Sequence, residues 1–347
     1  MEQILRYACI GAGGIARKKH LNGYSKLPSV KPVAVCDTNQ EAAKRLASDF
    51  GILGVYTDYR ELLEREHLDL VSVCTPNALH KEITVEALKH GCNVHVEKPI
   101  ALNEAEAKEI AAAEKQYGKQ VQIGLNKRFL GNTILVKHLL DTGFFGHIYH
   151  TRCGWERNSG IPGVGRWFTN KALSGGGALI DLGVHYLDLA LSVMGWPEPE
   201  KVSGSISNTF LLEGNRIRRG YQSSSGTIDV EDMANGSVIM KSGQTLLFCF
   251  SWASNIEEEI QYIEALGTKA GFKIQNGKLT LYTQLGGSMF TMIPDETTLP
   301  LDQNEFQSFV DCIQTGRQPE TTVEQSIRVM KLIDMIYDSF VQWRDIN

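Results

Sequence analysis

An acid and a histidine, Asp181 and His185, lie four residues apart in a mostly apolar stretch, residues 173–196, that also contains Asp188. In a helix this spacing places both side chains on one face. A carboxylate there could orient a substrate, and an imidazole could accept a proton near neutral pH. The glycines at 175–177 would let the backbone approach a ligand. From these residues alone, Asp181 could equally be a first-turn acid favoured by the helix dipole, and His185 a hydrogen-bonded core histidine.

A glycine pattern near the start of the chain predicts a dinucleotide-binding turn. Residues 10–16 read IGAGGIA, a G-x-G-x-x-A motif between a predicted strand and a predicted helix. The first glycine permits a tight turn, the second lets backbone amides approach a pyrophosphate, and the alanine allows close helix packing. The helix N-terminus adds partial positive charge. The turn supplies the candidate cofactor contacts Gly11, Gly13, Gly14, Ile15 and Ala16.

Asp37 indicates which dinucleotide is bound. It ends the second predicted strand, 21 residues after Ala16. A carboxylate at this position accepts the hydroxyls of the adenosine ribose and repels the 2′-phosphate of NADP. Thr38, Asn39 and Gln40 follow, so no arginine stands directly behind it to bind that phosphate. The sequence therefore favours NAD over NADP, against the alternative of a glycine turn with an unrelated aspartate.

Two further motifs, CTPNALH and EKP, follow predicted strands of the same sheet. Ligands bind beyond the carboxyl ends of the strands in such sheets, so we expect both motifs at the crevice of the glycine turn. Taken singly, a Thr-Pro pair is an ordinary turn and a lone lysine is an ordinary solvated side chain. The candidates are Thr75, Pro76, Asn77 and His80 in the first motif, and Glu97 and Lys98 in the second.

The predicted elements divide the chain at about residue 125. Before it, strands alternate with helices, which predicts a doubly wound parallel sheet of the Rossmann type, an NAD-binding domain of residues 1–125. After it, a helix, a strand and the helix of Asp181 lead to strands over about 201–290, separated by glycine and Asn-Gly turns. These strands predict an antiparallel sheet. Two final helices complete an α+β domain of residues 126–347, and the last helix can pack back on the first domain.

Composition and charge narrow the class of partner. The chain of 347 residues is 42% hydrophobic and 22% charged, with a net charge of -5. Nucleic acids and anionic membranes are bound by basic stripes, which the sequence does not have. We find no signal-peptide pattern and no apolar run of the roughly 18 residues that a membrane span requires, so we expect a cytoplasmic protein. Seven cysteines without a C-x-x-C pair indicate neither a disulfide framework nor a zinc site.

The motifs occur together, in the order G-x-G-x-x-A, Asp37, CTPNALH, EKP and GGGALIDLGVHYLD. In this combination the chain resembles, over nearly its whole length, the glucose–fructose oxidoreductase/inositol 2-dehydrogenase/rhizopine-catabolism family (Gfo/Idh/MocA). The resemblance implies a Rossmann domain followed by a domain with a large open, mostly antiparallel sheet. It also implies a nicotinamide cofactor, and a homodimer or homotetramer assembled through that sheet.

The resemblance assigns roles by position. Lys98 corresponds to the family's active-site lysine, Asp181 to its acid and His185 to its histidine. Thr75, Pro76, Asn77, His80, Glu97 and Lys98 would line the dinucleotide, together with Asn126, Arg166 and Trp167. Arg128 lies with Asn126 at a predicted strand end that faces the cleft. Arg128 and Trp155 are candidate substrate contacts beside the three catalytic residues. The acid and the histidines do not form a three-ligand set, so we expect no metal.

The resemblance also implies the reaction, which is NAD-dependent oxidation of a secondary hydroxyl of a sugar, glycoside or cyclitol. For a glycoside we favour the C3 hydroxyl. His185 is the preferred base, while Lys98 would hydrogen-bond the reacting oxygen and can relay the proton. Two alternatives stay open at this point. One is an enzyme that retains NAD and uses transient oxidation for glycoside elimination, and the other is a non-catalytic sugar or dinucleotide sensor.

Overall fold

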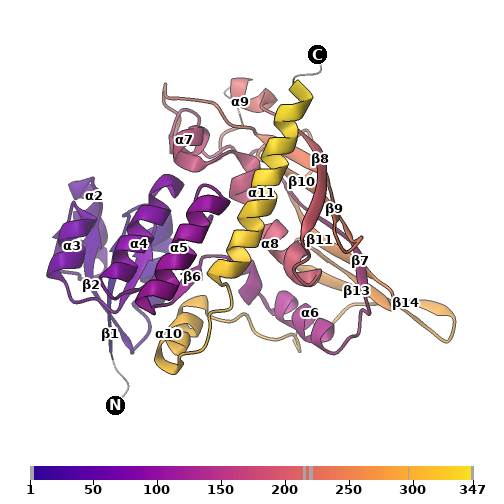
Figure 1. The fold of residues 1–347 in the computed structure, drawn as a ribbon, viewed down its shortest axis with the longest axis horizontal. Helices are drawn as coiled ribbons and strands as arrows, with labels where there is room; N and C mark the ends of the chain where they lie inside the picture. The colour runs from indigo at the N-terminus through magenta and orange to yellow at the C-terminus, as the bar shows by residue number, and fades with distance from the viewer. Residues whose placement is uncertain (1–3, 214–215, 219–221, 296, 345–347) are drawn as a thin grey trace. The chain divides into compact units, whose positions relative to one another are not determined.

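The computed structural model describes residues 4–213, 216–218, 222–295 and 297–344, with side chains as far as Phe340 at the C-terminal end. The chain divides into two compact units. Unit 1 comprises residues 1–125 and 304–327, and unit 2 comprises residues 126–303 and 328–347 (Figure 1). The helical segment 304–327 therefore belongs to the unit that contains the glycine turn.

Unit 1 contains a six-stranded parallel sheet in the order β3-β2-β1-β4-β5-β6. The order reverses beside β1, the strand that leads into the glycine turn, and such switch points are where doubly wound sheets bind ligands. The strands are β1 Leu5–Ile10, β2 Val30–Cys36, β3 Gly54–Tyr56, β4 Leu70–Val73, β5 Asn93–Val96 and β6 Val121–Ile123. The doubly wound parallel sheet predicted from the sequence is confirmed.

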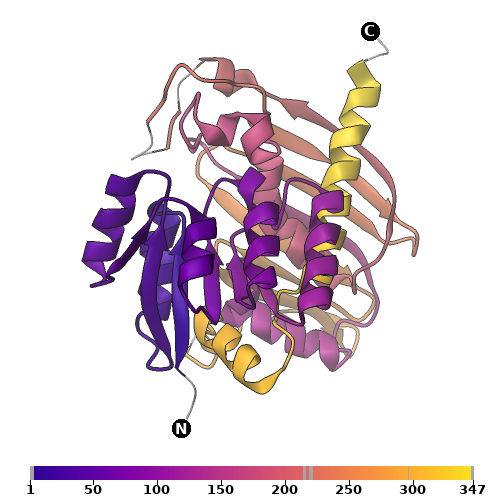
Figure 2. The ribbon, with the colours of Figure 1, turned by 60° about the vertical axis from the view of Figure 1, so that its left-hand side comes forward.

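Helices cover both faces of this sheet. α1, α2 and α10 share a core cluster on one face, while α3 contacts α4 and α4 lies beside α5 (Figure 1, Figure 2). Their bounds are α1 Asn22–Tyr24, α2 Gln40–Asp49, α3 Tyr59–Arg65, α4 His80–Lys89, α5 Glu104–Tyr117 and α10 Glu305–Thr315. A π-helical turn, Ala16–Leu21, links the glycine turn to α1.

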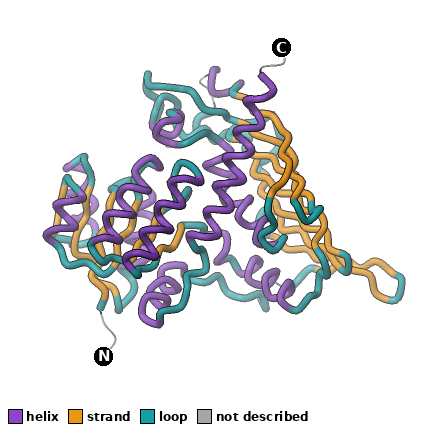
Figure 3. Tube along the Cα trace, in the orientation of Figure 1, coloured by secondary structure: helices purple, strands orange, loops and turns teal. Residues whose placement is uncertain are grey.

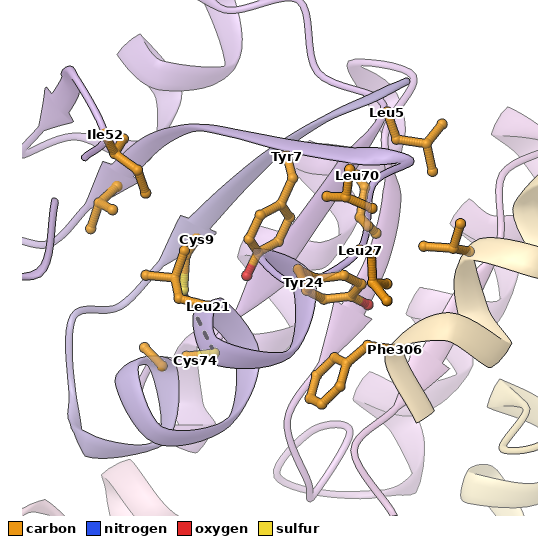
Figure 4. Packing of buried hydrophobic residues seen from close by; sticks show 14 of the residues in the cluster. Leu5, Tyr7, Cys9, Leu21, Tyr24, Leu27, Ile52, Leu70, Cys74 and Phe306 are labelled. Carbon is orange, nitrogen blue, oxygen red and sulfur yellow. Dashed lines mark hydrogen bonds between the residues drawn. The ribbon is translucent and has the colours of Figure 1, made fainter. Parts of the chain in front are cut away.

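The core of unit 1 explains why residues 304–327 belong to it. Phe306 of α10 packs against the Tyr24 ring, with 4.9 Å between ring centroids, and Tyr24 packs against Tyr7 of β1 (Figure 4). A Cβ at Gly23 would lie 2.3 Å from the Phe306 ring, so this contact requires a glycine. Cys9 and Cys74 are buried in the same cluster as free thiols.

Unit 2 contains one eight-stranded sheet in the order β14-β13-β12-β11-β7-β10-β9-β8. β7 and β10 pair parallel and the other neighbours pair antiparallel, which confirms a large, mostly antiparallel sheet. Figure 3 shows the strands of the sheet in orange. The strands are β7 Ile148–Glu156, β8 Pro199–Ser207, β9 Met233–Met240, β10 Thr245–Ser251, β11 Ile260–Gly267, β12 Ala270–Gln275, β13 Lys278–Leu285 and β14 Ser288–Met292.

The helices of unit 2 include the one that carries Asp181. It begins as a π-helical turn, Leu179–Gly183, and continues as α8, Val184–Val193, packed on β7 and β11. The others are α6 Gly131–Asp141, α7 Lys171–Ser174, α9 Thr209–Glu213 and most of α11 Val323–Arg344. α9 lies within the range of about 201–290 over which the sequence predicts strands.

One helical stretch, Lys171–Val193, is long and apolar enough to cross a membrane by length and composition alone, contrary to our reading of the sequence. Its most apolar window is 83% buried inside the structure, however. Such burial is typical of a core helix.

Candidate active site

The glycine turn has the backbone that a dinucleotide turn requires. Gly11 adopts a φ of +99°, and a Cβ there would lie 2.4 Å from the Cys74 carbonyl oxygen, so only glycine fits. Cβ atoms at Gly13 and Gly14 would meet no atom within 4 Å, so the backbone is open there to a close approach. Ala16 is fully buried, as close packing of the helix on the sheet demands.

Asp37 holds the same turn from the end of β2. Its Oδ2 accepts the Ala12 N–H at 2.7 Å, and its Oδ1 accepts the Asn39 N–H at 2.8 Å. The carboxylate is thereby fixed beside the turn, and each oxygen retains a lone pair for a ribose hydroxyl. This arrangement fits the role that the sequence predicts for Asp37.

The CTPNALH motif supplies one ligand candidate and one structural link. Thr75 Oγ1 is buried and finds no hydrogen-bond partner among the described residues, as a hydroxyl directed to a ligand would. His80, by contrast, is fully engaged. Its Nε2 lies 2.9 Å from the Thr75 carbonyl oxygen and its Nδ1 lies 2.7 Å from that of Pro99. Burial lowers the pKa of His80, although both carbonyl groups oppose the change. His80 therefore joins the CTPNALH motif to the EKP motif. The sequence predicted His80 as a cofactor contact and did not predict this link.

These observations test whether unit 1 fits a dinucleotide, and the residues fit. An open glycine turn, a fixed carboxylate at the end of β2 and the buried Thr75 hydroxyl all lie at the carboxyl edge of one sheet. Asn77 is buried, and Ile15 is exposed in the turn. Their contact with a dinucleotide remains a prediction.

The EKP motif places a buried carboxylate directly before the lysine. Glu97 is 7% exposed and its Oε1 lies 2.9 Å from His20 Nε2 and 3.4 Å from Lys19 Nζ. Its Oε2 accepts the Lys98 backbone N–H at 3.3 Å. Glu97 is thus bound inside unit 1, so the structure gives no support to its assignment as a dinucleotide contact. Neither Lys19 nor His20 was predicted from the sequence.

In unit 2, the helix around α8 presents Asp181 and His185. They are the two residues between 176 and 191 that are not buried. Asp181 lies in the π-helical turn Leu179–Gly183, and His185 lies one turn later in α8. The Trp252 indole donates its N–H to Asp181 Oδ2 at 2.9 Å, which fixes the carboxylate. The expected common face is present, and Trp252 is a residue that sequence reasoning missed.

An aromatic and charged cluster surrounds these two residues within unit 2. The Trp155 ring lies 6.2 Å from the His185 ring, and its N–H donates to Glu259 Oε1 at 2.6 Å. The Arg157 guanidinium lies 4.4 Å from the Trp155 ring centroid. Burial lowers the pKa of Arg157, and the negative charge of Asp181 opposes this change. Trp155 was predicted as a substrate contact, whereas Arg157 and Glu259 were not.

Two of the glycines before this helix, Gly176 and Gly177, serve packing and not the approach of a ligand. A Cβ at Gly176 would lie 2.0 Å from Tyr337 Oη, and one at Gly177 would lie 1.8 Å from the Glu231 carbonyl oxygen. Glu231 is 4% exposed, and its carboxylate accepts the N–H groups of Gly177 and Leu179. Burial raises the pKa of Glu231, while these N–H groups and Tyr337 oppose the rise. A buried carboxylate therefore caps the helix that carries Asp181.

Arg128 is used inside unit 2. Its Nε lies 2.6 Å from Asp188 Oδ2, and both side chains are buried. Asn126 and Arg128 lie in a short 3₁₀ helix, Asn126–Phe129, and not at the strand end that was predicted. The structure therefore gives Arg128 an internal partner and no support as a substrate contact.

The remaining assignments stay predictions. Arg166 is exposed and Trp167 stacks on Phe168, with 3.7 Å between ring centroids. Both belong to unit 2, as does Asn126, and their contact with a cofactor is untested. Pro76 precedes the short 3₁₀ helix Asn77–Leu79. Over the described ranges, no group of three or more His, Cys, Asp or Glu side chains is arranged to hold a metal ion.

Comparisons with known proteins agree with this geometry. Residues 5–125 match the family model described as oxidoreductase family, NAD-binding Rossmann fold. Residues 133–273 match the GFO/IDH/MocA C-terminal domain. The two matches cover the glycine turn, Asp37 and the EKP motif in unit 1, and Asp181 and His185 in unit 2.

Individual relatives extend the similarity to nearly the full chain. D-glucoside 3-dehydrogenase of Escherichia coli (strain K12) is 33% identical over 342 residues, which is 96% of this chain and 95% of the relative. scyllo-Inositol 2-dehydrogenase (NAD(+)) of Bacillus subtilis (strain 168) is 28% identical over 93% of this chain and 90% of the relative. Aldose-aldose oxidoreductase from Caulobacter crescentus, in a crystal structure with glycerol, has a TM-score of 0.81 at 25% identity, and the match covers 98% of each chain.

Proposed function

The chain belongs to the Gfo/Idh/MocA family of NAD(P)-dependent oxidoreductases, and on this basis we propose that it oxidises a secondary hydroxyl of a sugar, glycoside or cyclitol with NAD. The observation that carries the proposal is the helix around α8. Asp181 and His185 are its two positions between residues 176 and 191 that are not buried, in a chain whose other unit has a dinucleotide turn. In a helix that served packing alone, apolar residues would suffice at these two positions. Instead they carry an imidazole beside Trp155 and an acid that is hydrogen-bonded to Trp252.

A bound nicotinamide cofactor would supply the acceptor for the hydride of the carbinol carbon. The protein must then remove the hydroxyl proton and hold the oxygen while the carbonyl forms. We assign the proton to His185, because an imidazole titrates near neutral pH. The Lys98 amine donates to the reacting oxygen, and Asp181, oriented by Trp252, accepts a hydrogen bond from a neighbouring substrate hydroxyl.

The finer assignments have separate support. The fixed Asp37 carboxylate favours NAD over NADP, and the inositol dehydrogenase relative carries NAD(+) in its name. The glucoside 3-dehydrogenase relative supports the C3 hydroxyl of a glucoside as the point of oxidation.

Assembly and location are part of the same proposal. We expect a homodimer or homotetramer formed through the eight-stranded sheet, whose neighbouring strands expose Ile239 and Leu247 on one face, at 44% and 42%. All seven cysteines are free, which suits a reducing, cytoplasmic compartment. We expect no nucleic acid, membrane or metal to take part.

A substrate panel tests the proposed reaction. NAD⁺ reduction is followed by the absorbance of NADH with methyl glucosides, free aldoses and inositols, and then with NADP⁺ in place of NAD⁺. We expect Lys98→Ala and His185→Ala each to lower turnover by about a hundredfold or more while NAD⁺ still binds in calorimetry. Unchanged turnover in either variant refutes its role, and a wild type that reduces NAD⁺ with no compound of the panel refutes the proposed function.

A further inference from the structure

Four ionisable side chains, three of them buried and Lys19 half-buried, form a cluster in unit 1 that the proposed reaction does not use. Lys19 and His20 lie in the π-helical turn directly after the glycine turn. Glu97 follows β5, and Glu305 is the first residue of α10. His20 is fully buried, and Glu97 and Glu305 are exposed by 7% and 6%. Three segments that are distant in sequence thus bring charge into the interior of one unit.

The contacts centre on Glu97. His20 Nε2 lies 2.9 Å from Glu97 Oε1, and Lys19 Nζ lies 3.4 Å from the same oxygen. Lys19 Nζ also lies 3.0 Å from Glu305 Oε1. On the opposite side of its ring, His20 Nδ1 lies 2.8 Å from Ser72 Oγ. A neutral His20 protonated at Nε2 satisfies both neighbours, because it donates to Glu97 and accepts from the Ser72 hydroxyl.

These partners keep Glu97 charged in a place where a lone carboxylate would take up a proton. Burial by itself raises the pKa of Glu97, but Lys19 and His20 overcome burial and hold the pKa well below its usual range. Burial likewise lowers the pKa of Lys19, and Glu97 and Glu305 reverse this effect. A buried carboxylate that several donors hydrogen-bond stays ionised and is held in one position.

Glu97 transmits this constraint to the next residue. Its Oε2 accepts the Lys98 N–H at 3.3 Å, so one carboxylate joins two side chains of the preceding helix to the backbone of the EKP motif. Gly124 closes the other side, where a Cβ would lie 3.1 Å from Glu97 Oε1. We propose that Lys19 and His20 are positioning residues, which act through Glu97 to fix the backbone from which the Lys98 amine extends.

The consequence is a connection, within unit 1, between the glycine turn and the EKP motif. The π-helical turn begins at the dinucleotide glycines, and Glu97 is the residue before Lys98. Ordering of that turn by a bound dinucleotide would reach Glu97 through the His20 hydrogen bond and the Lys19 ion pair, and would reach Lys98 through its backbone hydrogen bond to Glu97. The inference rests on the proposed function, since only that function gives Lys98 a part in the reaction.

A matched pair of substitutions separates positioning from packing. His20→Leu removes the donor to Glu97 but keeps apolar volume, whereas His20→Gln retains an N–H that reaches the carboxylate. His67→Leu, at an exposed histidine of the same unit, is the control. Reductive ¹³C-methylation labels the lysine amines for NMR, and Lys98→Arg identifies the Lys98 resonance. We expect this resonance to move in His20→Leu, to return towards its wild-type position in His20→Gln and to stay unchanged in His67→Leu.

Turnover gives a second readout. In His20→Leu we expect kcat to fall by roughly tenfold, with the KM and Kd of NAD⁺ within about twofold, because misplacement of a catalytic group acts on the chemical step. His20→Gln should recover most of kcat. If His20→Leu does not fold, Ser72→Ala, which removes only the hydroxyl that orients the ring, should shift the Lys98 resonance in the same direction by a smaller amount.

Two results overturn the inference: a Lys98 resonance that does not move in the leucine or alanine variant, and an equal loss of kcat in the leucine and glutamine variants. The resonance requires no turnover. A wild type that oxidises no carbohydrate therefore contradicts the proposed function alone, and the NMR result still decides whether His20 positions Lys98.

Discussion

Replacing Tyr337 by phenylalanine removes one hydroxyl from α11 and leaves the rest of the side chain in place. That hydroxyl donates to Glu231 Oε1 at 2.9 Å, and the same carboxylate accepts the N–H groups of Gly177 and Leu179. A hydrogen bond to a charged group contributes about 1.5–3 kcal/mol. We therefore expect Tyr337→Phe to weaken the start of the helix that carries Asp181 by about this amount.

Hydrogen exchange measures the loss locally. Because each 1.4 kcal/mol is a factor of ten, protection of the amides over 177–181 should fall on the order of ten- to a hundredfold. Tyr282→Phe, on β13 of the same unit and outside this network, is the matched control and should leave these amides unchanged. The Glu231 pKa, already raised by burial, should rise further in Tyr337→Phe, because one of the groups that oppose the rise is removed.

Two outcomes would refute this reasoning. If protection over 177–181 is unchanged, the Tyr337 hydroxyl does not hold the capping carboxylate. If protection falls equally throughout unit 2, the substitution has lowered global stability and the carboxylate has no particular effect on this helix.

Three further variants test other parts of the account. The folded pKa of Glu97 lies below the ordinary glutamate value of 4.5, so its contribution to stability is present above that value and is lost as the pH falls towards the folded pKa. Glu97→Gln should remove this loss. In an acid titration, the free energy of unfolding should therefore depend less on pH in the variant than in the wild type. Asp37→Ser combined with Thr38→Arg should raise kcat/KM with NADP⁺ relative to NAD⁺, and a wild type that already prefers NADP⁺ would contradict our view of Asp37. Trp252→Phe should lower kcat/KM for the carbohydrate by roughly tenfold or more without changing NAD⁺ affinity, because Asp181 loses a hydrogen-bond donor worth about 1.5–3 kcal/mol. Unchanged steady-state kinetics would show that this hydrogen bond does not orient the acid.

The sequence predicts the regular parts of the fold well, because their periodicity and caps are local. Helix α2 begins where Asn39 caps it and ends just before Gly51, which has a φ of +64°. Strand β3 has no such signal, since its three residues are all half-buried and show no alternation. Periodicity also predicts α10 but cannot say which core it joins. Phe306 decides that through contacts with Tyr24, which is far away in the sequence.

In the candidate site, too, the local sequence predicts some features and residues distant in the sequence determine the others. Residue types and spacing identify Asp181, His185 and the glycine turn, because their motif is contiguous. The groups that hold these residues come from distant segments, as Trp252 and Glu231 do, and no local pattern marks them. Gly176 and Gly177 were misinterpreted for this reason, since the groups that require them, Tyr337 and Glu231, lie far along the chain.

Transfer of a label tests the central claim most directly. Methyl glucoside with deuterium at C3 is incubated with the protein and NAD⁺, and the nicotinamide product is analysed by mass spectrometry. If His185 and Lys98 serve hydride transfer from a secondary carbinol, deuterium appears in released NADH and the labelled substrate reacts more slowly than the unlabelled one. Deuterium that stays entirely in the sugar, in a mixture in which NADH nevertheless forms, would contradict oxidation at C3.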